Sequence, residues 1–155
     1  MALKLNISKT YNRVEWFFLK GIMSRLGLPE GWIDRVMSCV TTPSFFVSIN
    51  GKTYCNILPS RKLRQGYFLS PYLFLLCAEG FSSLLARAEG EGRLHGVSIC
   101  RRAFRISHLL FANDSLLFCW ANEEEVQVIS EVLQTYAASS SQCICHTPNP
   151  KGFEA

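Results

Sequence analysis

Two apolar runs flank a single polar pair in the second half of the sequence, and this pattern constrains the fold more than any other. The runs are FRISHLLFA and SLLFCWA, and Asn113 and Asp114 lie between them. Short apolar runs around a polar break are typical of paired strands, and asparagine and aspartate favour tight turns. We therefore predict an antiparallel hairpin joined through Asn113-Asp114.

Two further segments have the patterns of strands. ALKLNI, residues 2–7, alternates apolar and polar residues as a half-buried strand does. FFVSINGKTYCNI, residues 45–57, contains Asn50-Gly51, which suits the positive φ angles of a type I′ turn. We predict a second hairpin there.

Apolar residues at helical spacing predict four helices between these strands. The first helix has Val14, Phe17, Phe18, Ile22 and Leu26 on its inner face, and the second runs from about Trp32 to Val40. The third begins with Ser70 as its N-cap and ends by Gly90 or Gly92. The fourth has Asn122 as its N-cap, and its inner face consists of Val126, Ile129, Leu133 and Tyr136. This order of elements indicates an α+β fold, an antiparallel sheet with helices packed on one face.

Composition limits the class of protein. The chain has 155 residues, enough for one domain with its own core. No uninterrupted apolar stretch approaches the roughly 18 to 20 residues that cross a bilayer, and the N-terminus lacks the apolar core of a signal peptide. We predict a protein that neither spans a membrane nor is secreted, and that lies inside the cell, in the nucleus or the cytoplasm.

The net charge of +4 is mild, but two basic clusters have aromatic residues nearby. One is Arg61, Lys62 and Arg64, and the other is Arg101, Arg102 and Arg105. Such groups neutralise phosphates, and aromatic rings stack on bases. A solvated basic face has the same composition, so this feature by itself leaves both interpretations open.

Several blocks of the sequence resemble one known family. They are ALKLNISKTYNRVEWFFL, RKLRQGYFLSPYLFLLCAEGFSSLL and HGVSICRRAFRISHLLFANDSLLFC. These blocks, in this order, are similar to the palm of a reverse transcriptase from a plant-type non-LTR (long interspersed) retrotransposon. The similarity runs from about residue 2 to residue 142, and residues 143–155 are expected to form a divergent, disordered tail.

The resemblance implies an RNA-directed DNA polymerase that acts on an RNA template and a DNA primer. In this family, aspartates on two strands bind two Mg²⁺ ions, which activate the primer hydroxyl and stabilise the leaving pyrophosphate. The three aspartate positions correspond here to Asn6, Asn113 and Asp114. An amide keeps the shape of a carboxylate but loses its charge, so the resemblance implies that Mg²⁺ binding and polymerisation are lost or impaired.

Other positions depart from the family as well. Asn12 stands where the family has an aspartate, and Tyr67-Phe68 replace an Asp-Pro pair. The whole chain has only two aspartates, beside seven asparagines and ten glutamates. This shortage suggests the decay of a silenced element by repeated aspartate-to-asparagine changes.

Some functional positions of the family remain. Tyr11 matches the aromatic residue that screens the 2′ position of the nucleotide sugar, and a core aromatic residue beside the first helix is the alternative for it. Arg64, Gln65 and Gly66 match the segment that lines the nucleotide and template site, where a glycine permits close backbone approach. In this context we expect Arg61, Lys62 and Arg64 to contact nucleic acid.

Three functions are therefore considered. The first is a truncated, catalytically impaired reverse transcriptase palm. The second is a non-enzymatic remnant that binds nucleic acid or protein. The third is a pseudogene product without a selected role.

Overall fold

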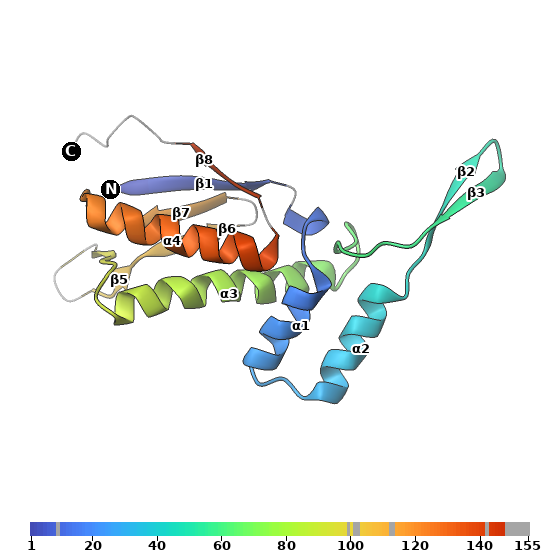
Figure 1. Cartoon of the computed structure of the whole chain (residues 1–155), viewed down its shortest axis with the longest axis horizontal. Helices are drawn as coiled ribbons and strands as arrows, with labels where there is room; N and C mark the ends of the chain where they lie inside the picture. The colour runs from blue at the N-terminus through green and yellow to red at the C-terminus, as the bar shows by residue number, and fades with distance from the viewer. Residues whose placement is uncertain (9, 99, 101–102, 112–113, 142, 148–155) are drawn as a thin grey trace. The chain divides into compact units, whose positions relative to one another are not determined.

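The computed structural model describes residues 1–8, 10–98, 100, 103–111, 114–141 and 143–147. The chain forms two compact units (Figure 1). We call residues 1–10 and 78–155 the sheet unit, and residues 11–77 the hairpin unit. The boundary lies within a long helix, α3 (Ser70–Gly90), so the first turns of α3 are described with the hairpin unit.

A four-stranded antiparallel sheet is the centre of the sheet unit. Its strands lie in the order β6 (His108–Phe111), β7 (Asp114–Phe118), β1 (Ala2–Ser8) and β8 (Cys143–Thr147). The strand nearest the N-terminus is therefore in the middle of the sheet, paired with β7 on one side and β8 on the other. This arrangement positions the residues at the end of β1 beside those at the start of β7.

Helices cover one face of this sheet (Figure 1). Along β7 the residues alternate, so that Ser115 and Leu117 are buried while Asp114 and Leu116 are exposed. The buried face packs on α4 (Glu123–Ser140) and on the part of α3 that belongs to this unit. The ring of Phe81 on α3 lies 5.0 Å from the ring of Tyr136 on α4. The described residues Lys4, Asp114 and Leu116 on the other face are exposed, and we call this face the open face. The predicted α+β class, with an antiparallel sheet and helices on one face, is confirmed.

The predicted cap of the fourth helix is confirmed. The side-chain oxygen of Asn122 accepts a hydrogen bond from the backbone N–H of Glu125 at 2.9 Å.

Between α3 and β6, two short strands, β4 (Val97–Ser98) and β5 (Arg105–Ile106), form a separate two-stranded sheet.

The hairpin unit contains a short 3₁₀ helix, η1 (Thr10–Asn12), two α-helices, α1 (Trp16–Arg25) and α2 (Glu30–Thr41), and one hairpin of β2 (Phe45–Ile49) and β3 (Lys52–Ile57). Asn50 and Gly51 have φ angles of 51° and 76°, so the predicted turn is confirmed. The core of the unit consists of Val14, Leu19, Met23, Ile33, Val36, Leu63, Leu73, Phe74 and Cys77.

Some predictions about single positions were wrong. Phe17, placed on the inner face of α1, is 91% exposed, and Leu19 and Met23 are buried instead. Val126, placed inside α4, is 43% exposed. Helical spacing fixes which residues share a face, but an error of one residue turns that face by about 100°.

Part of the segment expected to be a disordered tail forms a strand, since Cys143–Thr147 are β8 and pair with β1. The rest of that tail, residues 148–155, lies outside the described residues. Within the described ranges, no helix combines the length and the apolar character needed to cross a bilayer.

Candidate functional site

The end of β1 and the start of β7 meet at the candidate metal site. Asn6 and Asp114 are cross-strand partners in the antiparallel pairing of these strands. Cross-strand partners lie about 5 Å apart and share one face of a sheet. Two of the three positions that the sequence analysis assigned to metal binding are therefore neighbours on the backbone.

The hairpin between β6 and β7 differs slightly from the predicted one. Phe111 pairs with Asp114, so Asp114 is the first residue of β7 and only the two residues before it connect the strands. Asn113, the third candidate position, lies outside the described residues. The prediction of a hairpin is confirmed, but Asp114 belongs to β7 and not to the connection between the strands.

Asp114 is paired with a lysine on the neighbouring strand. The Nζ atom of Lys4 lies 3.4 Å from Oδ1 of Asp114, and both side chains are about half exposed, at 53% and 50%. Lys4 is two residues before Asn6 on β1, on the open side of the sheet. Sequence analysis missed this pairing, although the alternation in ALKLNI already places positions 4 and 6 on one face.

The basic segment 61–64 belongs to the hairpin unit. Nη1 of Arg61 lies 3.4 Å from Oε1 of Glu15, which neutralises part of its charge. The charged groups of Lys62 and Arg64 lie 5.9 and 5.8 Å from the centre of the Phe45 ring, within the range of a cation–π contact. Lys62 and Arg64 are both exposed. No pattern in the sequence indicated the roles of Glu15 and Phe45.

The backbone of this segment is strained at Lys62, whose φ angle is 101°. Residues other than glycine rarely adopt such a backbone conformation. Hydrogen bonds hold it in place: the N–H of Lys62 donates to the carbonyl of Val14 at 3.0 Å, and the Trp16 indole N–H donates to the carbonyl of Lys62 at 3.0 Å. The segment is thus fixed to the start of α1, and its cations are presented from a rigid backbone.

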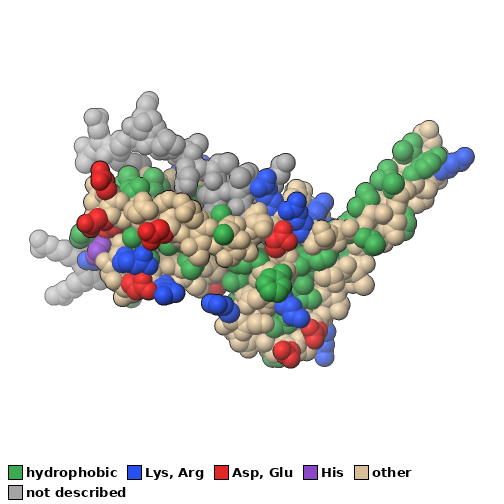
Figure 2. Space-filling view, viewed as in Figure 1, with side chains coloured by type: hydrophobic (Ala, Val, Ile, Leu, Met, Phe, Trp, Pro, Cys, Tyr) green, Lys and Arg blue, Asp and Glu red, His purple; other side chains and the backbone are tan. Residues whose placement is uncertain are grey.

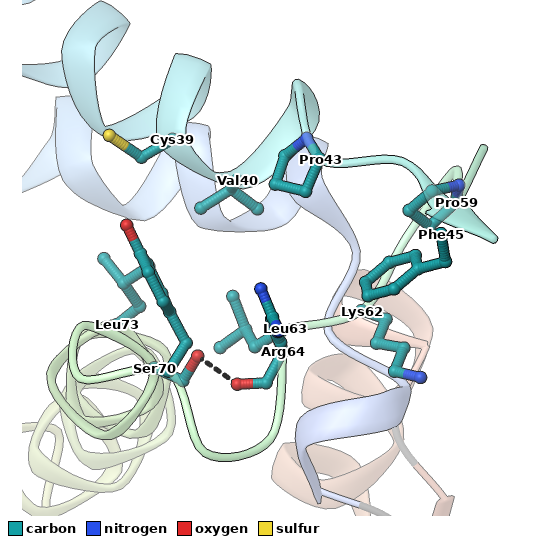
Figure 3. Close-up of a pocket in the computed structure, with 11 residues that line it drawn as sticks. Cys39, Val40, Pro43, Phe45, Pro59, Lys62, Leu63, Arg64, Ser70 and Leu73 are labelled. Carbon is teal, nitrogen blue, oxygen red and sulfur yellow. Dashed lines mark hydrogen bonds between the residues drawn. The ribbon is translucent and has the colours of Figure 1, made fainter. Parts of the chain in front are cut away.

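The basic segment forms part of the wall of a small pocket (Figure 3). It holds about 70 Å³ of free space, and its lining includes Cys39, Phe45, Lys62, Arg64 and Tyr67. Ligand sites for molecules of nucleotide size are several times larger. A nucleic acid that meets these cations would therefore bind along the surface and not inside the pocket.

The residues after Arg64 connect this segment to α3. The Ser70 hydroxyl donates to the carbonyl of Arg64 at 2.6 Å, as the dashed line in Figure 3 marks. Ser70 is the first residue of α3, and its hydroxyl holds the preceding loop. Gln65 is exposed, and Gly66 has a φ angle of 81° with open space where a Cβ would be. Glycine is thus favoured at position 66 by its backbone angle and not by close approach to another part of this chain.

Tyr11 is partly buried against the core of the hairpin unit. Its ring lies 5.4 Å from the ring of Phe74, and its carbonyl accepts a hydrogen bond from the Leu63 N–H at 2.8 Å. These contacts agree with the alternative of a core aromatic residue. A role in screening the nucleotide sugar stays a prediction.

The second basic cluster is described only in part. Arg101 and Arg102 lie outside the described residues, while Arg105 is an exposed residue of β5 and Phe104 beside it is 95% exposed.

Comparison with models of known families shows the family of this chain. A family model described as reverse transcriptase (RNA-dependent DNA polymerase) matches residues 1–145. An uncharacterized mitochondrial protein of Arabidopsis thaliana is 50% identical over 72 residues, which are 46% of this chain and 59% of that protein. This chain therefore spans less than two thirds of the length of that relative.

A solved structure has a similar fold. The apo telomerase of Candida tropicalis, truncated from its C-terminal domain, matches 99% of this chain and 31% of its own chain with a TM-score of 0.66. The sequence identity is 13%, so this likeness concerns the fold alone.

Proposed function

The chain belongs to the reverse transcriptase (RNA-dependent DNA polymerase) family, and we propose that it is a palm of that family in which the catalytic metal site is impaired. Its RNA template and DNA primer are the substrates that the family implies. We further propose a plant-type non-LTR retrotransposon as its origin. The similar sequence blocks and the plant relative, 50% identical over 72 residues, support this origin.

The register of Asn6 with Asp114 carries the proposal of an impaired site. It brings together two positions that the family resemblance assigns to metal binding, and one of them is an amide. The third position, Asn113, is an amide as well. One carboxylate then remains of the three that the family uses.

The donor set does not fit a pair of Mg²⁺ ions. Mg²⁺ is a small, hard cation that dehydrates reluctantly and is held through carboxylate oxygens. Among the described residues, no group of three or more histidine, cysteine, aspartate or glutamate side chains is arranged to hold a metal ion.

The energetic effect of these changes is large. A carboxylate that loses its charge next to a divalent ion loses several kcal/mol of attraction even in a screened site. About 4 kcal/mol less stabilisation of a transition state lowers a rate by roughly three decades. Two such changes lower polymerisation below useful rates.

Primer extension tests this proposal. The chain is incubated with an RNA template, an annealed DNA primer and nucleotides, with Mg²⁺ in one series and Mn²⁺ in another. We expect no template-dependent product. Asp114→Asn is the matched control, because any product that survives this change does not depend on the site. Template-dependent synthesis by the unaltered chain that Asp114→Asn removes would overturn the proposal.

Binding of nucleic acid without catalysis is the second candidate function. The exposed Lys62 and Arg64 and the rigid backbone that presents them favour it. It requires no metal, and its salt dependence is a direct test.

Persistence as a pseudogene product without a selected role is the third candidate, and a broad, uncooperative thermal unfolding transition would favour it.

The compartment is a separate proposal. The Arabidopsis relative is named as a mitochondrial protein, so we add the mitochondrion to the nucleus and the cytoplasm that the sequence predicts. Microscopy of a fluorescent fusion in plant cells distinguishes the three.

A further inference from the structure

Lys4 forms an ion pair with the one carboxylate that remains at the candidate metal site. Its Nζ atom lies 3.4 Å from Oδ1 of Asp114. The Cα partner of Lys4 on β7 is Leu116, two residues beyond Asp114, so the lysine side chain reaches diagonally across the strand pair. Long side chains span this diagonal readily.

The surroundings of this pair offer Asp114 little other charge. Asp114 is the only carboxylate on a strand among the described residues of the sheet unit, because each glutamate described there lies on or directly after α3 or α4. Besides Lys4 and its cross-strand partner Asn6, its described neighbours on the open face include the exposed apolar residues Leu109, Phe111 and Leu116. Among the residues that the structure describes on this face, one carboxylate and one ammonium group therefore balance each other.

This balance is the reverse of what a divalent ion needs. A site for Mg²⁺ or Mn²⁺ has an excess of negative charge, and a fixed ammonium group beside the ligand repels the ion. We propose that Lys4 is the resident counter-cation of Asp114 and that it competes with divalent cations for this carboxylate. The proposal rests on the proposed function, since it takes positions 6, 113 and 114 as the family's metal site.

The first experiment measures the ion pair without any metal. A double-mutant cycle of Lys4→Met and Asp114→Asn gives their coupling as a ratio of unfolding equilibrium constants. We expect coupling of up to about fivefold at low salt, the range of an exposed ion pair. The coupling should shrink as salt is added. Lys4→Arg, which keeps the charge, should retain it.

The second experiment measures competition. Asn6→Asp with Asn113→Asp restores the carboxylates, and electron paramagnetic resonance of free Mn²⁺ reports binding. Adding Lys4→Met to this variant should tighten Mn²⁺ binding about tenfold, the scale of one charge acting on a divalent ion a few ångströms away. The matched control is Lys20→Met, which removes a lysine paired with Asp34 in the hairpin unit and should leave Mn²⁺ binding unchanged.

The outcomes separate this inference from the proposed function. Absence of coupling in the cycle overturns the assignment of Lys4. Coupling without Mn²⁺ binding by the restored variant supports Lys4 as the counter-cation and overturns the placement of the metal site. Mn²⁺ binding that Lys4→Met does not tighten, or that Lys20→Met tightens equally, overturns the competition.

Discussion

Glu125 connects two loops of the sheet unit from a buried position. Its side chain is 3% exposed and accepts hydrogen bonds from the backbone N–H groups of Trp120 and His95, at 3.0 and 3.2 Å. It also bonds to Nδ1 of His95 at 3.0 Å, while the His95 and Trp120 rings stack 4.3 Å apart. One carboxylate thus joins the start of α4 to the segment that follows α3.

Replacing this carboxylate should destabilise the fold. Glu125→Ala leaves two backbone N–H groups without their acceptor, and we expect a loss of about 2 to 3 kcal/mol in the free energy of unfolding. Glu124→Ala is the matched control, because Glu124 lies in the same first turn of α4 but is exposed. The control should cost less than about 1 kcal/mol. Denaturant titration measures both, and equal losses would contradict the assigned role.

His108 should make the stability of the fold depend on pH. Burial lowers its pKa below the ordinary 6.5, although Glu89 and Glu79 act in the opposite direction. Its ring nitrogens are hydrogen-bonded to Ser82 and Ser107. Because the unfolded chain takes up the proton first as pH falls, the folded state loses stability from about pH 6.5 down to the lowered pKa.

We expect the melting temperature to fall over that range in the unaltered chain and to fall less in His108→Gln. Thermal unfolding followed by circular dichroism between pH 7.5 and pH 5 measures this, with ionic strength held constant. An identical pH slope in both proteins would show that another group titrates there.

At the scale of the elements, glycine is required at position 96, directly before β4, because the backbone at the end of β5 lies close to it. A Cβ at this position would lie 2.6 Å from the backbone carbon and oxygen of Ile106 and 2.9 Å from the backbone nitrogen of Ser107. Backbone atoms cannot move aside as a flexible side chain can. Gly96→Ala should therefore separate β4 from β5 and destabilise the fold by about 1 to 3 kcal/mol.

Gly21 gives the matched control for this change. It lies within α1, and a Cβ there has nothing within 4 Å. Because alanine loses less conformational freedom than glycine in a helix, Gly21→Ala should stabilise the fold by up to about 1 kcal/mol. Opposite shifts in melting temperature are expected, and destabilisation by both changes would contradict this account of Gly96.

The sequence predicts an element correctly where the interactions that form it join residues close together in the chain. The turn at Asn50-Gly51 and the cap at Asn122 depend on a few adjacent residues, and both predictions are confirmed. β8 was not predicted because its pairing with β1 joins distant parts of the chain, and CICHT alone gives no sign of a partner. At the candidate site, the sequence identified Asn6 and Asp114 only through the family resemblance. The structure pairs them across β1 and β7, and their role in metal binding stays a prediction.

At the scale of the whole molecule, charge is divided unequally between the two units. The hairpin unit contains eight lysines and arginines and three acidic residues, a net charge of +5, while the sheet unit has a net charge of −1. No aspartate or glutamate occurs in residues 35–78. Apolar side chains are also exposed along β2 and β3, as Figure 2 shows. A polyanion with stacking bases therefore suits the hairpin unit better than the sheet unit.

We expect the chain to bind single-stranded RNA in a salt-dependent manner through the basic segment of the hairpin unit. Replacing Arg61, Lys62 and Arg64 by serine should weaken binding at low salt and reduce the slope of log affinity against log salt by about 2, since each lost phosphate contact removes roughly 0.7. Fluorescence anisotropy of a labelled oligonucleotide measures both quantities. Chelation of divalent ions should change neither.

The control for this prediction removes the same charge from elsewhere in the unit. Lys20, Arg25 and Arg35 lie on α1 and α2, and their replacement by serine leaves the net charge of the unit equal to that of the first variant. If the rigid segment around Lys62 forms the interface, only the first variant should lose most of its binding. Equal losses in both would mean that the RNA responds to net charge alone, and the interface at residues 61–64 would be rejected.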